Sequence, residues 1–133
     1  VISTVDLERM VRFHAEHQAF ATLAVQERQT SRYLLFDEQL QLCGRRGGES
    51  TELVCPSKQP QALGFCGIHV ISPRLLPMMT EDGVFPIVPC YLRLAAQGGK
   101  IVGFRADEYY WRDLGRRENL AQAAQDVEQN IVI

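Results

Sequence analysis

The 133-residue sequence has none of the features that mark a membrane-spanning, secreted or nucleic-acid-binding protein. It contains no apolar run of the roughly 20 residues that cross a bilayer, and it does not open with a basic and then apolar signal segment. It has no excess of basic charge, because 14 Lys and Arg residues stand against 16 Asp and Glu residues. We therefore expect a compact cytoplasmic protein without a membrane or nucleic-acid partner.

Cysteine and histidine are scarce, and neither forms a recognisable disulfide or metal pattern. The four cysteines include no Cys-x-x-Cys pair, and three of them stand in apolar surroundings, which is typical of buried free thiols in a reducing compartment. His14 and His17 are three residues apart without a third ligand near them, so we interpret both as surface or packing residues. His69 stands in an apolar strand and is interpreted as a core histidine.

Familiar catalytic motifs are missing as well. No Ser-His-Asp or Cys-His arrangement has supporting spacing, and the phosphate-binding glycine loop of P-loop proteins is not found. The sequence has no internal repeat, and with 46% hydrophobic residues it suffices for one domain, residues 1–133, around one core.

The apolar patterns predict a mixed α/β domain. Spacings of three and four predict a helix over residues 6–17 with Asp6 as its N-cap. The other expected elements are strands at 19–25 and 32–37, a hairpin over 32–43, a strand at 62–72, a helix at 73–79 capped by Ser72, a helix within 84–99 ended by Gly98, strands at 100–106 and 108–113, and a helix at 116–129 with apolar positions at Leu120, Ala123, Ala124 and Val127. Paired glycines and two prolines predict a long surface loop over residues 45–61, of a kind that is often functional.

Asp113 lies where the last short strand ends and a glycine turn leads into the last helix, a position from which α/β sheets present side chains to ligands. A carboxylate there suits Mg²⁺, which takes one or two protein carboxylates and completes its coordination with phosphate oxygens and water. The alternative is that Asp113 caps the turn or the following helix. Tyr110 and Trp111, just before it, are interpreted as core residues rather than as a ligand platform.

Arg116 and Arg117 open the last helix, where a positive charge opposes the helix dipole at a cost of roughly 0.3 to 1 kcal/mol. A bound phosphate would remove that cost; alternatively, both side chains extend into solvent or pair with nearby acids. Gly64 and Gly67 interrupt an apolar strand, which either lets a ligand approach the backbone or marks a bulge without a ligand. Residue patterns alone thus indicate an α/β domain with a candidate metal or phosphate site near Asp113.

Three segments carry a family resemblance: "VDLERMVRFHAEHQAFATLAVQERQTSRYLLFD", "GFCGIHVISPRLL" and "GGKIVGFRADEYYWRDLGRRENLAQA". In this order they resemble the sugar-phosphate nucleotidyltransferases, the mannose-1-phosphate guanylyltransferase-like group in particular, which have an F-x-G-I-x-V strand and a later W-x-D-[IVL]-G-T-P-E-x-L turn. The resemblance covers nearly the whole chain. It implies the second half of a Rossmann-like (GT-A-like) nucleotidyltransferase domain, with a mixed sheet and flanking helices.

Enzymes of this family join a nucleoside triphosphate to a sugar 1-phosphate and release pyrophosphate, so the resemblance implies these two substrates and Mg²⁺. Asp113 matches the family's second Mg²⁺-binding aspartate, and Gly67 matches a backbone position beside the sugar. The chemistry needs no covalent protein nucleophile, because the sugar phosphate attacks the α-phosphorus in line while metal and basic groups neutralise the charge. We expect Asp113 to be the catalytic and metal-binding residue, and Gly67, Arg116 and Arg117 to contact substrate.

The sequence also departs from the family. Arg116 and Arg117 replace the usual Thr-Pro after the glycine turn, and no Glu-Lys-Pro element precedes the sugar strand. The family's glycine-rich G-x-G-T-R loop and its N-x-D aspartate would both stand before Val1. We therefore expect an acceptor-side half that is inactive alone and works with an N-terminal half of the same domain. The alternatives are a non-catalytic binding or assembly module that keeps the fold, and an α/β domain with an unrelated ligand.

Overall fold

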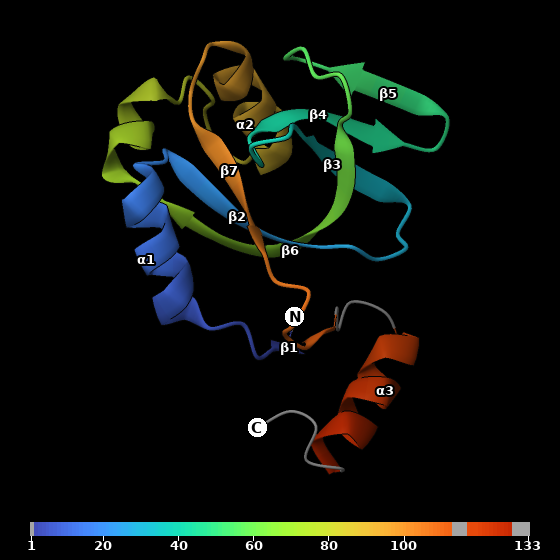
Figure 1. Ribbon diagram of the computed structural model, residues 1–133. Coiled ribbons are helices and arrows are strands. Elements are labelled where there is room, and N and C mark those ends of the chain that lie inside the picture. Colours follow the sequence, from blue (N-terminus) through green and yellow to red (C-terminus); the bar gives the residue numbers. More distant parts are fainter. Residues whose placement is uncertain (1, 113–116, 129–133) are drawn as a thin grey trace.

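The computed structural model describes residues 2–112 and 117–128. A mixed six-stranded sheet has the order β5-β4-β3-β6-β2-β7, and β1 pairs with β8 in a separate two-stranded sheet (Figure 1). The strands are β1 (Ile2–Ser3), β2 (Ala21–Gln26), β3 (Arg32–Phe36), β4 (Leu42–Gly47), β5 (Ser50–Leu53), β6 (Gln61–Ile71), β7 (Ile101–Arg105) and β8 (Trp111–Arg112). The helices are α1 (Leu7–His17), α2 (Ile87–Ala96) and α3 (Arg117–Glu128), with a 3-10 helix at Pro73–Met78. The expected α/β class with a mixed sheet and flanking helices is confirmed, and it is consistent with a Rossmann-like fold.

One pair of neighbouring strands in the six-stranded sheet, β2 and β7, is parallel. Val25 near the end of β2 lies opposite Arg105 at the end of β7, so both strands finish at the same edge of the sheet. The other pairings described in this sheet are antiparallel. Ligands of α/β proteins bind outside the carboxyl ends of parallel strands, so the edge formed by the ends of β2 and β7 is a candidate ligand site.

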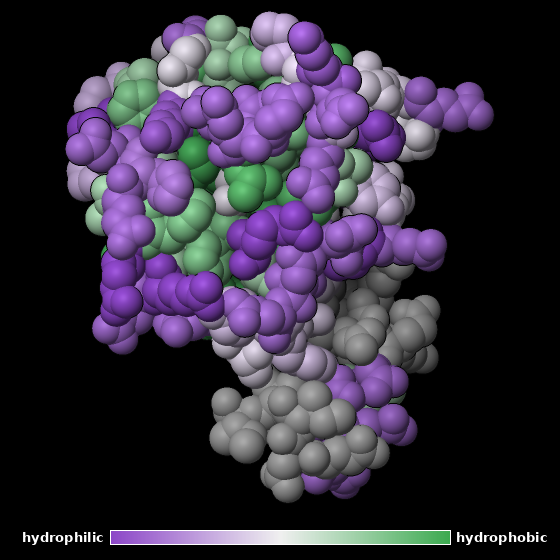
Figure 2. Space-filling model, viewed as in Figure 1, coloured by the Kyte–Doolittle hydropathy of each residue, from purple (hydrophilic) through white to green (hydrophobic). Residues whose placement is uncertain are grey.

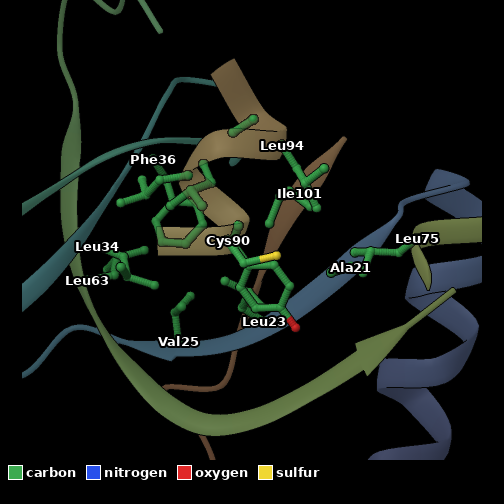
Figure 3. Close-up of a cluster of buried hydrophobic side chains, with 14 residues drawn as sticks. Ala21, Leu23, Val25, Leu34, Phe36, Leu63, Leu75, Cys90, Leu94 and Ile101 are labelled. Atoms are coloured by element: carbon green, nitrogen blue, oxygen red, sulfur yellow. The ribbon is translucent and has the colours of Figure 1, made fainter. Parts of the chain in front are cut away.

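Two hydrophobic layers cover opposite faces of the sheet. Because successive residues of a strand point to opposite faces, β2 contributes Leu23 and Val25 to one layer and Ala24 to the other. Figure 3 shows Leu23 and Val25 with Phe36 and Cys90 in the first layer. Helix α2 supplies Cys90, Tyr91, Leu92, Leu94 and Ala95 to this layer, as its apolar pattern predicts, and α1 supplies Met10 and Phe13 to the second. The helices therefore flank the sheet on both sides.

Local capping explains where the first helices begin. Asp6 Oδ1 accepts a hydrogen bond from the backbone N–H of Arg9 at 3.0 Å, which confirms Asp6 as the N-cap of α1. Ser72 accepts from the N–H of Arg74 at 3.3 Å, as predicted, but the following segment is a six-residue 3-10 helix. Pro77 lies inside it and has no N–H to donate, which prevents a regular α-helix from continuing there. None of the described helices is long and apolar enough to cross a membrane.

The predicted loop over residues 45–61 is wrong in its first half. Strand β4 continues to Gly47, and β5 pairs with it in an antiparallel hairpin. Gly48 and Glu49 form the turn, and Gly48 has the positive φ of 58° that such two-residue turns require. All four residues of β5 are exposed, so this hairpin shows no alternation of apolar and polar residues that could identify it in the sequence.

Helix α3 lies beside the β1–β8 pair, apart from the six-stranded sheet (Figure 1). The Tyr110 hydroxyl donates to the Asp126 carboxylate, and Asp126 and Ala123 are buried. Of the predicted apolar positions, Ala123 is buried as expected, whereas Ala124 and Val127 are exposed. The side chain of Leu120 lies outside the described residues. Apolar spacing therefore identified Ala123 but not the polar anchor Asp126.

Candidate functional site

The candidate site begins with the pairing of β1 and β8. Ile2 lies opposite Arg112, and the backbone N–H of Tyr110 donates to the hydroxyl of Thr4 at 2.8 Å. The backbone N–H of Thr4 donates in return to the carbonyl of Tyr110 at 3.0 Å. The segment that leads to Asp113 is thus held against the first described residues of the chain.

Hydrogen bonds also fix the neighbouring ends of β2 and β7. The side-chain amide of Gln26 donates to two carbonyl oxygens of the turn at residues 106–109, each at 2.9 Å. Asp107 accepts from the backbone N–H of Glu27 and from Arg105 Nε, both at 2.6 Å. Burial raises the pKa of the Asp107 carboxyl, but these hydrogen bonds outweigh it and hold the pKa below the usual range. Asp107 is therefore an ionised structural group whose oxygens are already engaged.

Arg28 is held flat between β6 and β8. Its guanidinium carbon lies 4.0 Å from the centre of the Trp111 ring, and its Nη2 donates to the carbonyl of Phe65 at 2.8 Å. A Cβ at Gly64 would lie 2.8 Å from the same guanidinium carbon, so the glycine leaves room for Arg28. Arg28 thus fills the space beside Gly64, which pairs regularly with Gln26, so this glycine fits neither of the two explanations considered for it, a ligand approach or a bulge. Arg28 Nε is buried and has no hydrogen-bond partner among the described residues.

Gly67 lies on a β-bulge. Residues 66–68 of β6 lie opposite Ala24 alone, and Gly67 has a positive φ of 77°. The indole N–H of Trp111 donates to the carbonyl of Cys66 at 2.6 Å and so ties the bulge to β8. Gly67 is exposed, and a Cβ there would meet no atom within 4 Å. The bulge interpretation is confirmed, and the open space beside Gly67 leaves room for a ligand.

An arginine-lined hollow of about 710 Å³ opens beside Arg28, between the β3–β4–β5 strands and the segment that leads into α2. We call it the arginine cleft; its basic side chains are Arg28, Arg32, Arg45 and Arg46, and its apolar wall includes Leu34, Phe65 and residues 86–89. Glu52 is the acidic side chain in this lining, and its Oε2 lies 3.0 Å from Arg45 Nε. The other three arginines have no ionic partner among the described residues. Hydrophilic side chains frame apolar surface on the face shown in Figure 2.

The predicted site residues differ in how far the structure describes them. Asp113 and Arg116 lie outside the described residues. Arg117 is the first residue of α3, but its side chain also lies outside the description. Gly67 is thus the predicted site residue whose surroundings are described, and it lies one residue from the Trp111 hydrogen bond. The arginines of the cleft were not identified from the sequence, although Arg45 and Arg46 fall within the segment predicted to be a functional loop.

The carboxylates at the ends of β2 and β7 limit where Mg²⁺ could bind. Among residues 2–112 and 117–128, no group of three or more His, Cys, Asp or Glu side chains could hold a metal ion. Asp107 is engaged by Arg105, and Glu108 lies 2.8 Å from Arg9. Mg²⁺ bound through substrate phosphates needs only one or two protein carboxylates. A Mg²⁺ site here would therefore depend on Asp113 rather than on a described carboxylate.

The histidines and cysteines have packing roles. His14 Nδ1 lies 2.8 Å from the Thr22 hydroxyl, and His17 Nδ1 lies 2.8 Å from the Phe13 carbonyl. The half-buried ring of His69 is hydrogen-bonded to the Tyr91 hydroxyl. Burial lowers the pKa of His69. Cys43, Cys66 and Cys90 are buried free thiols, which confirms the prediction, and burial raises the pKa of Cys43 and Cys66 to about 11. The buried thiols of Cys43 and Cys66 are therefore unsuited to nucleophilic chemistry at neutral pH.

Comparison with known proteins gives no family for this chain. Its sequence matches no protein-family model and no curated protein. Chemically, this geometry offers an exposed backbone bulge, a fixed guanidinium group beside the strand that leads to an aspartate, and a positively charged cleft, which together suit an anionic ligand.

Proposed function

We propose that this chain forms the acceptor side of a sugar-1-phosphate nucleotidyltransferase, which transfers a nucleoside monophosphate from a triphosphate to a sugar 1-phosphate. The observation that carries the proposal is the position of Arg28, stacked on Trp111 two residues before Asp113. A guanidinium fixed there is suited to hold the acceptor phosphate while other oxygens of that phosphate face a metal ion at Asp113. Arg28 Nε, buried and without a described partner, is a donor that such a phosphate would satisfy.

The β1–β8 pair supports the need for a preceding half of the domain. In the family, the first metal-binding aspartate would stand just before Val1, and chain entering through β1 would bring it alongside the segment that leads to Asp113. Two carboxylates on adjacent strands are a suitable pair of protein ligands for Mg²⁺. Leu7 and Val11 of α1 are 58% and 52% exposed, which leaves apolar surface close to β1 that such a half could cover.

In the proposed reaction, an oxygen of the sugar 1-phosphate attacks the α-phosphorus of the nucleoside triphosphate, the bond from this phosphorus to the bridging oxygen of the β-phosphate breaks, and pyrophosphate leaves. Mg²⁺ bound at Asp113 would neutralise charge on the phosphates. Arg28 holds the acceptor phosphate, and the open bulge at Gly67 lets the sugar lie against the backbone. Arg116 and Arg117 are proposed to contact phosphate at the start of the last helix, in place of the family's Thr-Pro.

The test is pyrophosphate release by the full-length protein with Mg²⁺, each of the common nucleoside triphosphates and a panel of sugar 1-phosphates. We expect turnover with at least one pair, a loss of about 100-fold or more in Asp113→Asn, and a raised KM for the sugar phosphate in Arg28→Gln. Arg12→Gln is the control, because Arg12 lies on the exposed side of α1 in an ion pair with Glu8. Comparing Asp113→Ala with Arg116→Ala for ligand affinity tests the arginine separately.

Two results would overturn the proposal. The first is the absence of pyrophosphate release with every pair, together with no heat of binding for any sugar 1-phosphate in isothermal titration. That result would favour the non-catalytic binding or assembly module. The second is full activity in Asp113→Asn, which would show that the aspartate before the glycine turn is not the metal ligand.

A further inference from the structure

The arginine cleft carries more positive charge than one phosphate monoester uses. Arg45 is paired with Glu52 across the β4–β5 hairpin, while Arg28, Arg32 and Arg46 have no ionic partner among the described residues. A phosphate monoester carries about −1.5 to −2 charges at pH 7. A metal ion at Asp113 would take up part of that charge, so a simple sugar 1-phosphate would leave the cleft strongly positive.

The four arginines separate into two pairs by their positions on the strands. Arg46 lies opposite Tyr33 in the β3–β4 ladder, so its side chain and that of Tyr33 lie on one face of this ribbon. Arg32 precedes Tyr33 and therefore lies on the other face, where Arg45 lies opposite Leu34. The arginines thus occupy two sides of the ribbon rather than one point.

A second, smaller hollow adjoining the cleft supports this division. Its lining includes Arg28, Tyr33 and Arg46, which also line the arginine cleft, and Glu27, whose carboxylate lies 3.6 Å from Arg105 Nη2. Arg32 and Arg45 line only the larger cleft. Arg28 is fixed on Trp111 and therefore belongs to the end of the cleft beside β8. Arg32 and Arg45 belong to the other part of the cleft, against the apolar segment at residues 86–89.

Building on the proposed function, we infer that the acceptor is a sugar 1-phosphate with a second acidic group, which Arg32 and Arg45 bind while Arg28 and Arg46 bind the reacting phosphate. A cleft of about 710 Å³ lies within the range of small-molecule sites and has room for a hexose with two charged substituents. Arginine suits both groups, because its planar fork of donors matches carboxylate and phosphate alike. Glu52 is a positioning residue that holds Arg45 when this second group is not bound.

The experiment measures affinity by isothermal titration on the full-length protein at low salt with four probes. These are inorganic phosphate, glucose 1-phosphate, glucuronic acid 1-phosphate and glucose 1,6-bisphosphate. We expect one or both of the doubly acidic sugars to bind about 10-fold or more tightly than glucose 1-phosphate, since a charge-assisted hydrogen-bond pair typically gives this factor. The comparison between them shows whether the second group is a carboxylate or a phosphate.

Variants then assign the preference to the cleft. Arg32→Gln should remove the preference for the doubly acidic sugar while leaving the affinity for glucose 1-phosphate unchanged. Glu52→Gln should increase the preference by a few-fold, because it frees Arg45 from its partner. Arg12→Gln should change neither affinity. A gain in one variant and a loss in the other is not a pattern that general unfolding produces.

Three outcomes would overturn the inference: equal affinity for the singly and doubly acidic sugars, an equal loss for all sugars in Arg32→Gln, or binding of inorganic phosphate as tightly as the doubly acidic sugars. The last would make the cleft a general anion surface. If pyrophosphate release persists with a neutral sugar 1-phosphate in any of these cases, only the inference fails. If no sugar 1-phosphate binds or reacts, the proposed function fails, and the inference fails with it.

Discussion

Gly64→Ala should displace Arg28, and the sign of its effect on stability should depend on whether Arg28 is present. The new Cβ would lie 2.8 Å from Arg28 Cζ, 2.9 Å from Nε and 3.0 Å from Nη1. These distances are too short for non-bonded carbon and nitrogen atoms, and the guanidinium is the flexible partner, so Arg28 must leave its position on Trp111.

The magnitude follows from what Arg28 loses and what the strand gains. The stacking on Trp111 is worth about 0.5–1 kcal/mol, and the charged hydrogen bond to the Phe65 carbonyl about 1.5 kcal/mol. Two effects offset part of this loss of stability. Arg28 Nε, which has no described partner, becomes hydrated, and alanine loses less backbone entropy on folding than glycine, which contributes about 0.5–1 kcal/mol. We expect Gly64→Ala to lower the free energy of unfolding by about 1 kcal/mol. In a protein that already carries Arg28→Ala, Gly64→Ala should instead raise the free energy of unfolding by about 0.5–1 kcal/mol.

Urea unfolding of the wild type, the two single variants and the double variant measures this coupling, which we expect to be about 2 kcal/mol. Trp111 is the only tryptophan in the sequence, so its fluorescence reports directly on the position of Arg28. Gly64→Ala and Arg28→Ala should change that fluorescence in the same way. Additive effects on stability, or an unchanged spectrum in Gly64→Ala, would refute the assigned contact between Arg28 and the glycine.

Other predictions follow from the same structure. Gly67→Ala should lower the free energy of unfolding by about 1 kcal/mol through backbone strain alone. Gly47→Ala, also in open space but without a positive φ, should instead raise it slightly, by up to about 0.5–1 kcal/mol, and urea unfolding compares the two. A thiol-reactive dye should label Cys55 before the three buried cysteines, as peptide mapping would show, and equal rates would contradict the burial. Burial lowers the pKa of His14 and His69 in the folded protein, so the unfolded state binds more protons below about pH 6.5. The free energy of unfolding should therefore fall as the pH decreases from about 6.5. Denaturant midpoints at pH 7.5 and 5.5 test this, and a higher midpoint at pH 5.5 would contradict it.

Elements with a strong local signal were predictable from the sequence. Asp6 is followed by apolar residues at helical spacing, and Ser72 is followed by a proline, so both helix starts were located correctly. The exposed end of the β4–β5 hairpin was missed because residues 45–47 and all of β5 are held by ladder hydrogen bonds without an apolar face. The contact of α3 through Asp126 was missed because a buried carboxylate looks in sequence like a surface residue.

The candidate site was only partly predictable, because its components come from distant segments. Arg28 stands in the polar stretch "QERQTSRY", where a charged residue normally indicates solvent exposure. Its role depends on Trp111, 83 positions later in the sequence, and no periodicity within one segment connects them. The resemblance to nucleotidyltransferases pointed to Asp113, which lies outside the described residues, and to Gly67 on the bulge of β6. It gave no reason to select the arginines of the cleft.

Gly64 and Gly67 show why the same sequence signal can have two physical causes. Both interrupt one apolar strand, and the sequence suggested the same two explanations for both, close approach of a ligand or a bulge without one. At Gly67 the cause is the backbone, because φ is 77° and a side chain would meet nothing. At Gly64 the cause is space, because φ is ordinary and the missing side chain makes room for Arg28. A d-alanine at position 67 should therefore relieve the strain of Gly67→Ala, whereas at position 64 the l-alanine strains no backbone and instead displaces Arg28 from Trp111.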